Sequence, residues 1–300
     1  MSELIPGITI FTPTYNRVDT LRRLYESIAN QKYDNIEWII VDDGSTDGTE
    51  DLVASLIKEG TVEIRYFYKS NGGKHTALNL GIHEASKEYF FCVDSDDYLE
   101  NGAISIIQDT IIRERPEGII AYKSEHPYHK RIGSMFPEHL EYVTLINLIN
   151  DYKCSGDRAI IHKTSAIKDC LIPEVVGQRF FPETYLFDRF DEKHKSYLLR
   201  ENLCVCEYMP EGYSSSFRQL MIDNALAMKM FFSRRIDMNV SWGIRYDAAY
   251  RYVAFSLLSG SNQGNYTGNN TGLLLLALIP GIIMYFVYSY HKAVSHRKKK

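Results

Sequence analysis

Four short β-rich runs in the first hundred residues alternate with amphipathic segments, and this alternation restricts the chain to few fold classes. The runs cover residues 8–12, 36–41, 63–68 and 89–93. After each of them, apolar residues recur at helical spacing, in segments near residues 21–28, 52–57, 77–85 and 103–112. Strand–helix alternation of this kind predicts an α/β fold, with a mostly parallel sheet flanked by helices on both faces.

The alternation loosens after residue 115. Two more strands are predicted, over residues 118–122 and 158–162, and the segment between them, rich in His, Pro and Lys over residues 123–140, is predicted to be a loop. Residues 216–236 and 241–258 are predicted to form two amphipathic helices. Cys204 and Cys206 alternate with apolar residues, which favours a buried strand over a metal site.

The charge balance argues against a nucleic-acid binder that relies on bulk charge. The 300 residues include 34 Lys and Arg and 38 Asp and Glu, which gives a net charge of −4. The last ten residues carry five basic side chains and no acid, which leaves −9 for residues 1–290. Five cysteines, an odd and sparse number, indicate reduced thiols in the cytosol, and the first residues lack the pattern of a signal peptide.

An uncharged stretch near the C-terminus is a candidate membrane anchor. Residues 272–290 are nearly all apolar, close to the ~20 residues that a spanning helix needs, and a basic tail follows at 291–300. Pro280 and Gly281 lie at its centre and are expected to break it into two halves too short to span. We therefore expect a re-entrant or interfacial anchor with both flanks cytoplasmic; the alternative is a buried core helix.

Polar, Gly-rich or acidic loops follow all four N-terminal runs: 12–17, 42–49, 71–77 and 94–97. Ligands of open parallel sheets bind outside the carboxyl ends of the strands, so these loops predict one binding site. The loops lack the Gly-x-Gly-x-x-Gly fingerprint of nicotinamide-binding proteins, and Gly72-Gly73-Lys74 is not a complete Walker A motif.

Asp94, Asp96 and Asp97 place three carboxylates within four residues. Their mutual repulsion and their hard oxygen atoms favour a divalent cation, Mn²⁺ or Mg²⁺, shared with substrate phosphates. Two structural alternatives remain open. Asp97 could cap the following helix, and Asp42-Asp43-Gly44-Ser45 could form an Asx turn.

The motifs FTPTYNR, VDDGSTDGT, NGGKHTALNLGI and FCVDSDDYL, in this order, resemble family 2 glycosyltransferases of the bacterial surface-glycan type, which have the GT-A fold. The resemblance is dense over residues 8–100 and thinner over 101–215. It implies a hexosyltransferase-type enzyme that transfers a sugar, with inversion, from a nucleotide-diphosphate sugar, usually a UDP-sugar, with a divalent metal. No Gln-x-x-Arg-Trp motif of processive synthases is found, which favours single additions.

The resemblance also implies binding residues for the nucleotide sugar. By position they are Thr12, Pro13, Tyr15, Arg17, Asp42, Asp43, Lys74, Asp94 and Ser95. Thr12, Pro13, Tyr15 and Arg17 would line the nucleoside pocket. Asp42 and Asp43 would reach the base and ribose, and Lys74 would lie near the nucleotide. Asp94 and Asp96 would form the DxD pair, with Asp96 as the direct ligand of the metal.

An inverting transfer needs a base that takes the proton of the acceptor hydroxyl. The family has it in an acidic motif that opens a helix, and the matching residue is Glu183 in FFPETYL, with Asp188 and Asp157 in reserve. The alternative for Glu183 is an exposed acid at a helix start.

These observations predict a division of the chain into four parts. A GT-A domain is expected over residues 1–215, with a nucleotide-sugar half to about 100 and an acceptor half after it. A helical extension follows at 216–260, then the membrane-associated segment 272–290 and the tail 291–300. The expected enzyme adds sugars to a glycan or lipid-linked acceptor at the cytoplasmic face of the membrane. The alternative is a non-catalytic subunit of a glycan assembly complex that binds a nucleotide sugar or lipid.

Overall fold

The computed structural model describes residues 5–31, 35–207 and 213–298. The chain divides into two compact units, and each is described by itself. Unit 1 comprises residues 1–172 and 186–209, and unit 2 comprises residues 173–185 and 210–300.

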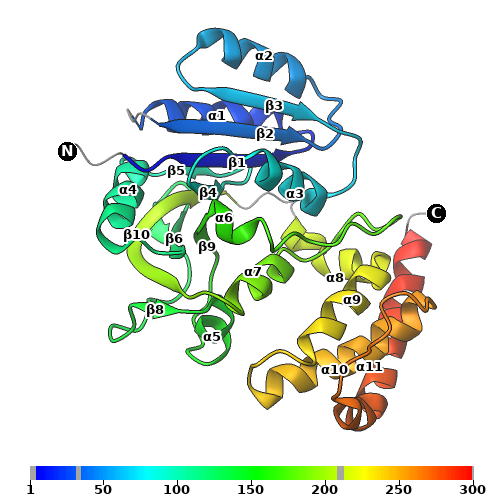
Figure 1. Cartoon of the computed structure of the whole chain (residues 1–300). Coiled ribbons are helices and arrows are strands. Elements are labelled where there is room, and N and C mark those ends of the chain that lie inside the picture. Colours follow the sequence, from blue (N-terminus) through cyan, green and yellow to red (C-terminus); the bar gives the residue numbers. More distant parts are fainter. Residues whose placement is uncertain (1–4, 32–34, 208–212, 299–300) are drawn as a thin grey trace. The chain divides into compact units, whose positions relative to one another are not determined.

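Unit 1 is built on one ten-stranded mixed sheet in the order β3-β2-β1-β4-β9-β6-β10-β5, with β7 beside β6 and β8 beside β10 (Figure 1). The first four strands are parallel to one another: β1 (Ile8–Thr14), β2 (Ile36–Asp42), β3 (Ile64–Tyr68) and β4 (Tyr89–Cys92). They follow the four runs seen in the sequence. The expected α/β sheet fold is confirmed.

The remaining strands of unit 1 bring antiparallel pairs into the sheet. They are β5 (Tyr98–Leu99), β6 (Gly118–Glu125), β7 (Lys130–Arg131), β8 (Tyr142–Val143), β9 (Arg158–Lys163) and β10 (Ser196–Cys206). The loop expected over residues 123–140 is partly wrong, because β6 continues to Glu125 and pairs with β7. Cys204 and Cys206 are buried on β10, as the alternating pattern predicted.

Four helices of unit 1 follow the apolar spacing seen in the sequence: α1 (Val18–Ala29), α2 (Thr49–Glu59), α3 (Lys74–Glu84) and α4 (Ala103–Glu114). The spacing did not predict the other helices of this unit, which are α5 (Leu145–Asn150), α6 (Thr164–Ile167) and most of α7 (Thr184–Asp191). Gly81 lets α3 approach the sheet closely, since a Cβ there would lie 2.2 Å from the Phe11 ring. This close packing fixes the N-terminus of α3 beside the strand ends of β1 and β2.

Unit 2 contains α8 (Tyr213–Asp223), α9 (Ala225–Arg235), α10 (Trp242–Ser259) and α11 (Thr271–Lys298). The sequence predicted one helix over residues 216–236, and this is wrong: α8 and α9 are separated at Asn224. The Asn224 side-chain oxygen accepts hydrogen bonds from the backbone N–H groups of Arg179 and Phe180, at 2.7 and 3.1 Å. The break thus serves to hold the 173–185 segment of the same unit.

Helix α11 is continuous through Pro280, so the expected break into two halves is wrong. Proline removes one backbone hydrogen bond, and packing against α10 offsets that loss. A Cβ at Gly281 would lie 2.5 Å from the Val253 Cβ, so the two helices meet at this glycine. Tyr288 also stacks on Phe255 of α10, with ring centroids 5.0 Å apart.

Candidate active site

The polar loops singled out in the sequence follow adjacent parallel strands. Thr14 lies opposite Asp42 in the β1–β2 register, and the pairing continues past the strands, since Asp43 N–H donates to the Thr14 carbonyl at 2.9 Å. Val93 N–H likewise donates to the Phe11 carbonyl at 2.9 Å. The ends of β1, β2, β3 and β4 therefore meet at one edge of the sheet, as the sequence predicted.

The first loop offers two accessible residues and two buried ones. Tyr15 is half exposed and Arg17 is partly exposed. Thr12 and Pro13 are buried inside β1, and the Thr12 hydroxyl accepts a hydrogen bond from the Trp38 indole at 3.0 Å. The structure thus brings Tyr15 and Arg17 to the surface of this edge, but not Thr12 and Pro13.

Asp42 and Asp43 are both buried and hydrogen bonded. Asp42 accepts from Ser45 N–H at 2.7 Å, the geometry of an Asx turn, and from the Tyr66 hydroxyl at 2.8 Å. Asp43 lies 2.6 Å from the Lys69 ammonium and accepts from the backbone N–H groups of Gly72 and Gly73 at 2.9 and 2.7 Å. It therefore ties the 71–73 loop to the end of β2.

The conformation of that loop requires glycine. Gly73 has φ 94° and ψ 157°, a backbone conformation that residues other than glycine rarely adopt. It precedes Lys74, the first residue of α3. The Lys74 ammonium lies 2.6 Å from Oδ1 of Asp94, so the third and fourth loops meet through this ion pair.

The Asp94–Asp97 turn is closed by a hydrogen bond from Asp97 N–H to the Asp94 carbonyl at 3.0 Å. Ser95 is buried within this turn. Asp97 does not cap α4, whose N-cap is Gly102. Instead its carboxylate forms a buried ion pair with the ammonium group of Lys123, at 2.6 Å.

Sequence reasoning missed Lys123. It lies at the end of β6, inside the segment expected to be a loop, and is 26 residues from its partner. Nothing local in the sequence distinguishes it from a surface lysine, because only the pairing of β6 within the sheet brings it to Asp97.

The three carboxylates of the turn differ in their electrostatic environment. Burial raises the pKa of Asp96, and the neighbouring charges of Asp94 and Asp97 raise it further. Burial also acts to raise the pKa of Asp94, but the charges of Lys74 and Lys123 outweigh it, so that the pKa lies below its usual range. A further positive charge beside Asp96 would therefore stabilise its ionised form.

The residues present fit a hard divalent cation. Asp94 and Asp96 offer carboxylate oxygens, and repulsion between carboxylates at Asp96 would be relieved by a bound cation. Among the described residues, no group of three or more His, Cys, Asp or Glu side chains could hold a metal ion. A cation here would thus take its other ligands from water and from substrate oxygens, as Mg²⁺ commonly does.

The candidate bases lie at three separate places. Glu183 is half buried directly before α7 and belongs to unit 2. Asp188 is buried within α7 and Asp157 is exposed before β9, both in unit 1. Of the three, Glu183 combines partial accessibility with a fixed backbone, since Tyr185 N–H donates to the Pro182 carbonyl at 3.0 Å.

Comparison with known proteins gives consistent matches. The model of the family "Glycosyl transferase family 2" matches residues 9–156. Glycosyltransferase GlyG of Streptococcus pneumoniae is 29% identical over 260 residues, which cover 81% of this chain and 83% of GlyG. A Campylobacter jejuni enzyme, GalNAc(5)-diNAcBac-PP-undecaprenol beta-1,3-glucosyltransferase, is 34% identical over 116 residues, or 38% of this chain and 36% of that enzyme. In other curated relatives, the matched region covers only 13% to 39% of the relative's own length.

Solved structures show the same fold. TarS 1–349 from S. aureus in complex with UDP-GlcNAc matches with a TM-score of 0.63 at 19% identity, over 92% of this chain and 80% of that chain. A mannosyltransferase from Pyrobaculum calidifontis in complex with GDP-Man and Mn²⁺ matches with a TM-score of 0.54 at 16% identity, over 98% and 87%. The sheet, the four loops and these matches agree: residues 9–156 carry a glycosyltransferase family 2 domain, and the chain is a transferase enzyme with a GT-A-like fold.

Proposed function

We propose that the enzyme transfers a sugar, with inversion, from a nucleotide-diphosphate sugar to a hydroxyl group of a glycan or lipid-linked acceptor during assembly of a surface glycan. The observation that carries this proposal is the gathering of Asp42, Asp43, Lys74, Asp94 and Asp96 at the carboxyl edge of four adjacent parallel strands. This is where open α/β sheets bind their ligands.

A UDP-sugar is the proposed donor. The TarS neighbour was solved with UDP-GlcNAc, and the Pyrobaculum neighbour with GDP-Man and Mn²⁺. In this chain the accessible Tyr15 and Arg17 would contact the nucleoside, and Asp42 and Asp43 would orient it directly or through the 71–73 loop. Lys74 and Ser95 would lie beside the diphosphate and sugar.

Asp94 and Asp96 would hold a divalent cation, Mn²⁺ or Mg²⁺. When bound, such a cation offsets negative charge on the departing diphosphate, an effect worth several kcal/mol. The chain adds fixed positive charge of its own at this edge through Lys74 and Lys123. The carboxylates and the lysines together would favour a leaving group that is more negative than the donor.

Glu183 is the proposed base. In an inverting displacement, the acceptor hydroxyl loses its proton while its oxygen forms the new bond to the anomeric carbon and the bond to the diphosphate breaks. A carboxylate that takes this proton typically contributes 10²–10⁴-fold to the rate. The donor half would be residues 1–100 and the acceptor half 101–215, with residues 216–260 as a helical extension.

A nucleotide-sugar panel tests the proposed reaction. The full-length enzyme is incubated with Mn²⁺ and UDP- or GDP-linked sugars, and release of UDP or GDP is measured. Release from at least one UDP-sugar supports the proposal. Binding of a UDP-sugar without any release, with or without a glycan acceptor, favours the non-catalytic alternative.

We further propose that α11 anchors the enzyme to the cytoplasmic face of a membrane. Residues 271–295 form a helix long and apolar enough to cross a bilayer, with mean hydropathy 2.1. Leu273, Ala277 and Tyr288 of α11 are buried, and Tyr288 stacks on Phe255 of α10. The helix also has an exposed apolar stripe consisting of Leu275, Ile279, Ile283, Phe286 and Tyr290.

The partner helix argues for an interfacial position of α11. Helix α10 carries the ion pair of Arg251 with Asp247 at 2.9 Å, and both charges act electrostatically on Tyr288 of α11. Charges are costly in the hydrocarbon core. The exposed apolar stripe would therefore lie in the membrane–water interface, with Lys292 near the anionic headgroups of the lipids.

Vesicle binding tests this anchor. Ile279→Ser, Ile283→Ser and Phe286→Ser combined leave the face on α10 intact, whereas deletion of residues 272–300 would uncover Phe255. The triple variant should lose co-sedimentation with phosphatidylglycerol vesicles and keep its melting temperature. Ile57→Ser, at an exposed site on α2, is the control. Full retention of the triple variant on vesicles contradicts the proposal.

A further inference from the structure

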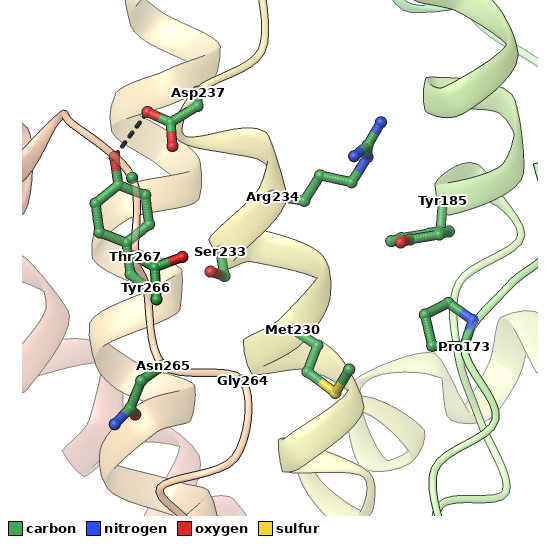
Figure 2. A pocket seen from close by; sticks show the side chains of 11 residues that line it. Pro173, Tyr185, Met230, Ser233, Arg234, Asp237, Gly264, Asn265, Tyr266 and Thr267 are labelled. Atoms are coloured by element: carbon green, nitrogen blue, oxygen red, sulfur yellow. Dashed lines mark hydrogen bonds between the residues drawn. The ribbon is translucent and has the colours of Figure 1, made fainter.

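Unit 2 contains a pocket of about 370 Å³ that none of the proposed donor residues lines. All of its lining residues belong to that unit. The volume lies in the lower part of the roughly 300–1,000 Å³ range of small-molecule sites. Figure 2 shows that both apolar side chains, such as Pro173 and Met230, and charged side chains, such as Arg234 and Asp237, line the pocket.

One face of α9 and the residues that follow it forms the first wall. Met230, Ser233, Arg234 and Asp237 are spaced i, i+3, i+4 and i+7, which places them on one side of the helix. The wall therefore presents a thioether, a hydroxyl, a guanidinium and a carboxylate in sequence. Since Arg234 and Asp237 carry opposite charges, the wall has no net charge.

Aromatic and apolar carbon forms the second wall. The Arg234 guanidinium carbon lies 5.6 Å from the centre of the Tyr185 ring. In Figure 2, Tyr185 and Pro173 lie together, across from Arg234 and Met230. The Tyr185 ring thus offers a flat aromatic surface beside the N–H donors of the Arg234 guanidinium.

The loop over residues 264–268 forms the third wall, and its conformation is fixed by hydrogen bonds. The buried Lys229 ammonium donates to the Asn265 side-chain oxygen at 2.6 Å and to the Ser261 carbonyl at 2.7 Å. Tyr266 N–H donates to the Tyr252 hydroxyl at 2.8 Å, and the Tyr266 hydroxyl donates to Asp237 at 2.7 Å.

Glycine is required where this loop meets α9. A Cβ at Gly268 would lie 1.8 Å from an Asp237 oxygen, and one at Gly264 would lie 2.5 Å from the Met230 Cγ. The polar groups of the pocket are therefore pre-organised, which lowers the entropic cost of binding a ligand.

We infer that this pocket binds one neutral sugar unit of the acceptor glycan. A sugar ring has apolar C–H faces, which suit Tyr185 and Met230, and a rim of hydroxyls that both donate and accept. Asp237 accepts from such hydroxyls, Arg234 donates to them and Ser233 does both. The balanced charge disfavours an anion.

The inference that this pocket binds an acceptor sugar rests on the proposed function, in which Glu183 is the base. This residue, the proposed base, precedes Tyr185 by two positions in the same segment of unit 2. Binding energy from a remote sugar unit would help to place the reacting hydroxyl, because interactions away from the reacting centre can be used for orientation.

Saturation-transfer NMR on the full-length enzyme tests the pocket. The probes are the methyl β-glycosides of glucose, galactose, N-acetylglucosamine and N-acetylgalactosamine, with UDP and Mg²⁺ present. At least one glycoside should receive saturation from the wild type. Tyr185→Ala and Arg234→Met, on different walls, should each weaken that binding about tenfold. Gln263→Ala, at an exposed site directly before the 264–268 loop and outside the pocket lining, is the matched control.

Three results would overturn the inference: no glycoside binds the wild type, binding survives both variants, or inorganic phosphate displaces the glycoside. If Tyr185→Ala does not fold, Arg234→Met decides. UDP release from the donor is measured in the same preparation. Donor turnover without glycoside binding contradicts the pocket alone, whereas glycoside binding without donor turnover contradicts the proposed function alone.

Discussion

The ammonium nitrogen of Lys74, at the start of α3, lies 2.6 Å from Oδ1 of Asp94, directly after β4. This ion pair joins the Gly-rich loop to the acidic turn. It also means that one oxygen of the proposed DxD pair already has a positive partner. Lys74 and a divalent cation would therefore share Asp94.

Lys74→Met should change cation and nucleotide binding in opposite directions. Without nucleotide, Mn²⁺ should bind more tightly, because Asp94 loses its competing ammonium group. UDP should bind at least about tenfold more weakly, because a charge-assisted contact to its phosphates is lost. Mn²⁺ titration by electron paramagnetic resonance and UDP calorimetry measure the two effects. Unchanged affinity for both contradicts a role for Lys74 in the site.

Asp43→Ala should lower both the melting temperature and the affinity for UDP. The substitution leaves the Lys69 ammonium and two backbone N–H groups without their acceptor, which releases the 71–73 loop. Asp47→Ala is the matched control, because Asp47 also accepts from a backbone N–H, that of Val18 at 3.0 Å, but is not one of the proposed binding residues. A lower melting temperature with unchanged UDP affinity would show that Asp43 is purely structural.

Glu183→Gln keeps the shape of the side chain and removes its capacity to take a proton. Transfer to an acceptor should slow by about 10²–10⁴-fold, while UDP affinity should barely change. Asp157→Asn, at an exposed site, should transfer at the wild-type rate. A loss of less than tenfold for Glu183→Gln transfers the role of base to Asp188 or Asp157.

His162 makes the stability of unit 1 sensitive to acid. Burial, with a smaller contribution from His194, lowers its pKa to about 3, and its ring packs 4.4 Å from that of Phe190. The unfolded chain therefore binds a proton that the folded chain does not, and stability falls as the pH drops below about 6.5.

Between pH 7 and pH 5, His162 should account for a loss of about 2 kcal/mol in the free energy of unfolding. His162→Leu should remove that part of the pH dependence, whereas His139→Gln, at an exposed site, should leave it. Urea-unfolding curves at the two pH values measure it. An equal loss in wild type and His162→Leu would contradict this assignment.

The sequence predicted the N-terminal half of the sheet well because buried parallel strands leave a local signal. Each is a continuous β-rich run, and the polar loop after it must lie at the same edge as the others. The four runs and loops of residues 8–97 could thus be placed together without knowledge of long-range contacts.

Long-range packing explains what the sequence did not predict. Pro280 indicates a broken helix by local rules, yet α11 continues because it packs on α10 at Gly281. The pattern of residues 216–236 indicates one helix, yet Asn224 is drawn to the backbone of residues 179 and 180. The Lys123–Asp97 pair and the pocket beside Tyr185 depend likewise on residues distant in sequence.

The proposed role of Asp94 and Asp96 is tested most directly by transfer from the UDP-sugar that the enzyme accepts, measured as UDP release with Mn²⁺. Asp96→Asn should lose at least about a hundredfold in rate, because the charge that holds the cation is halved. Excess EDTA should abolish wild-type release, and Asp109→Asn, at an exposed site on α4, should match the wild type. Robust release by Asp96→Asn, or full wild-type release in EDTA, would contradict metal-assisted transfer at this site.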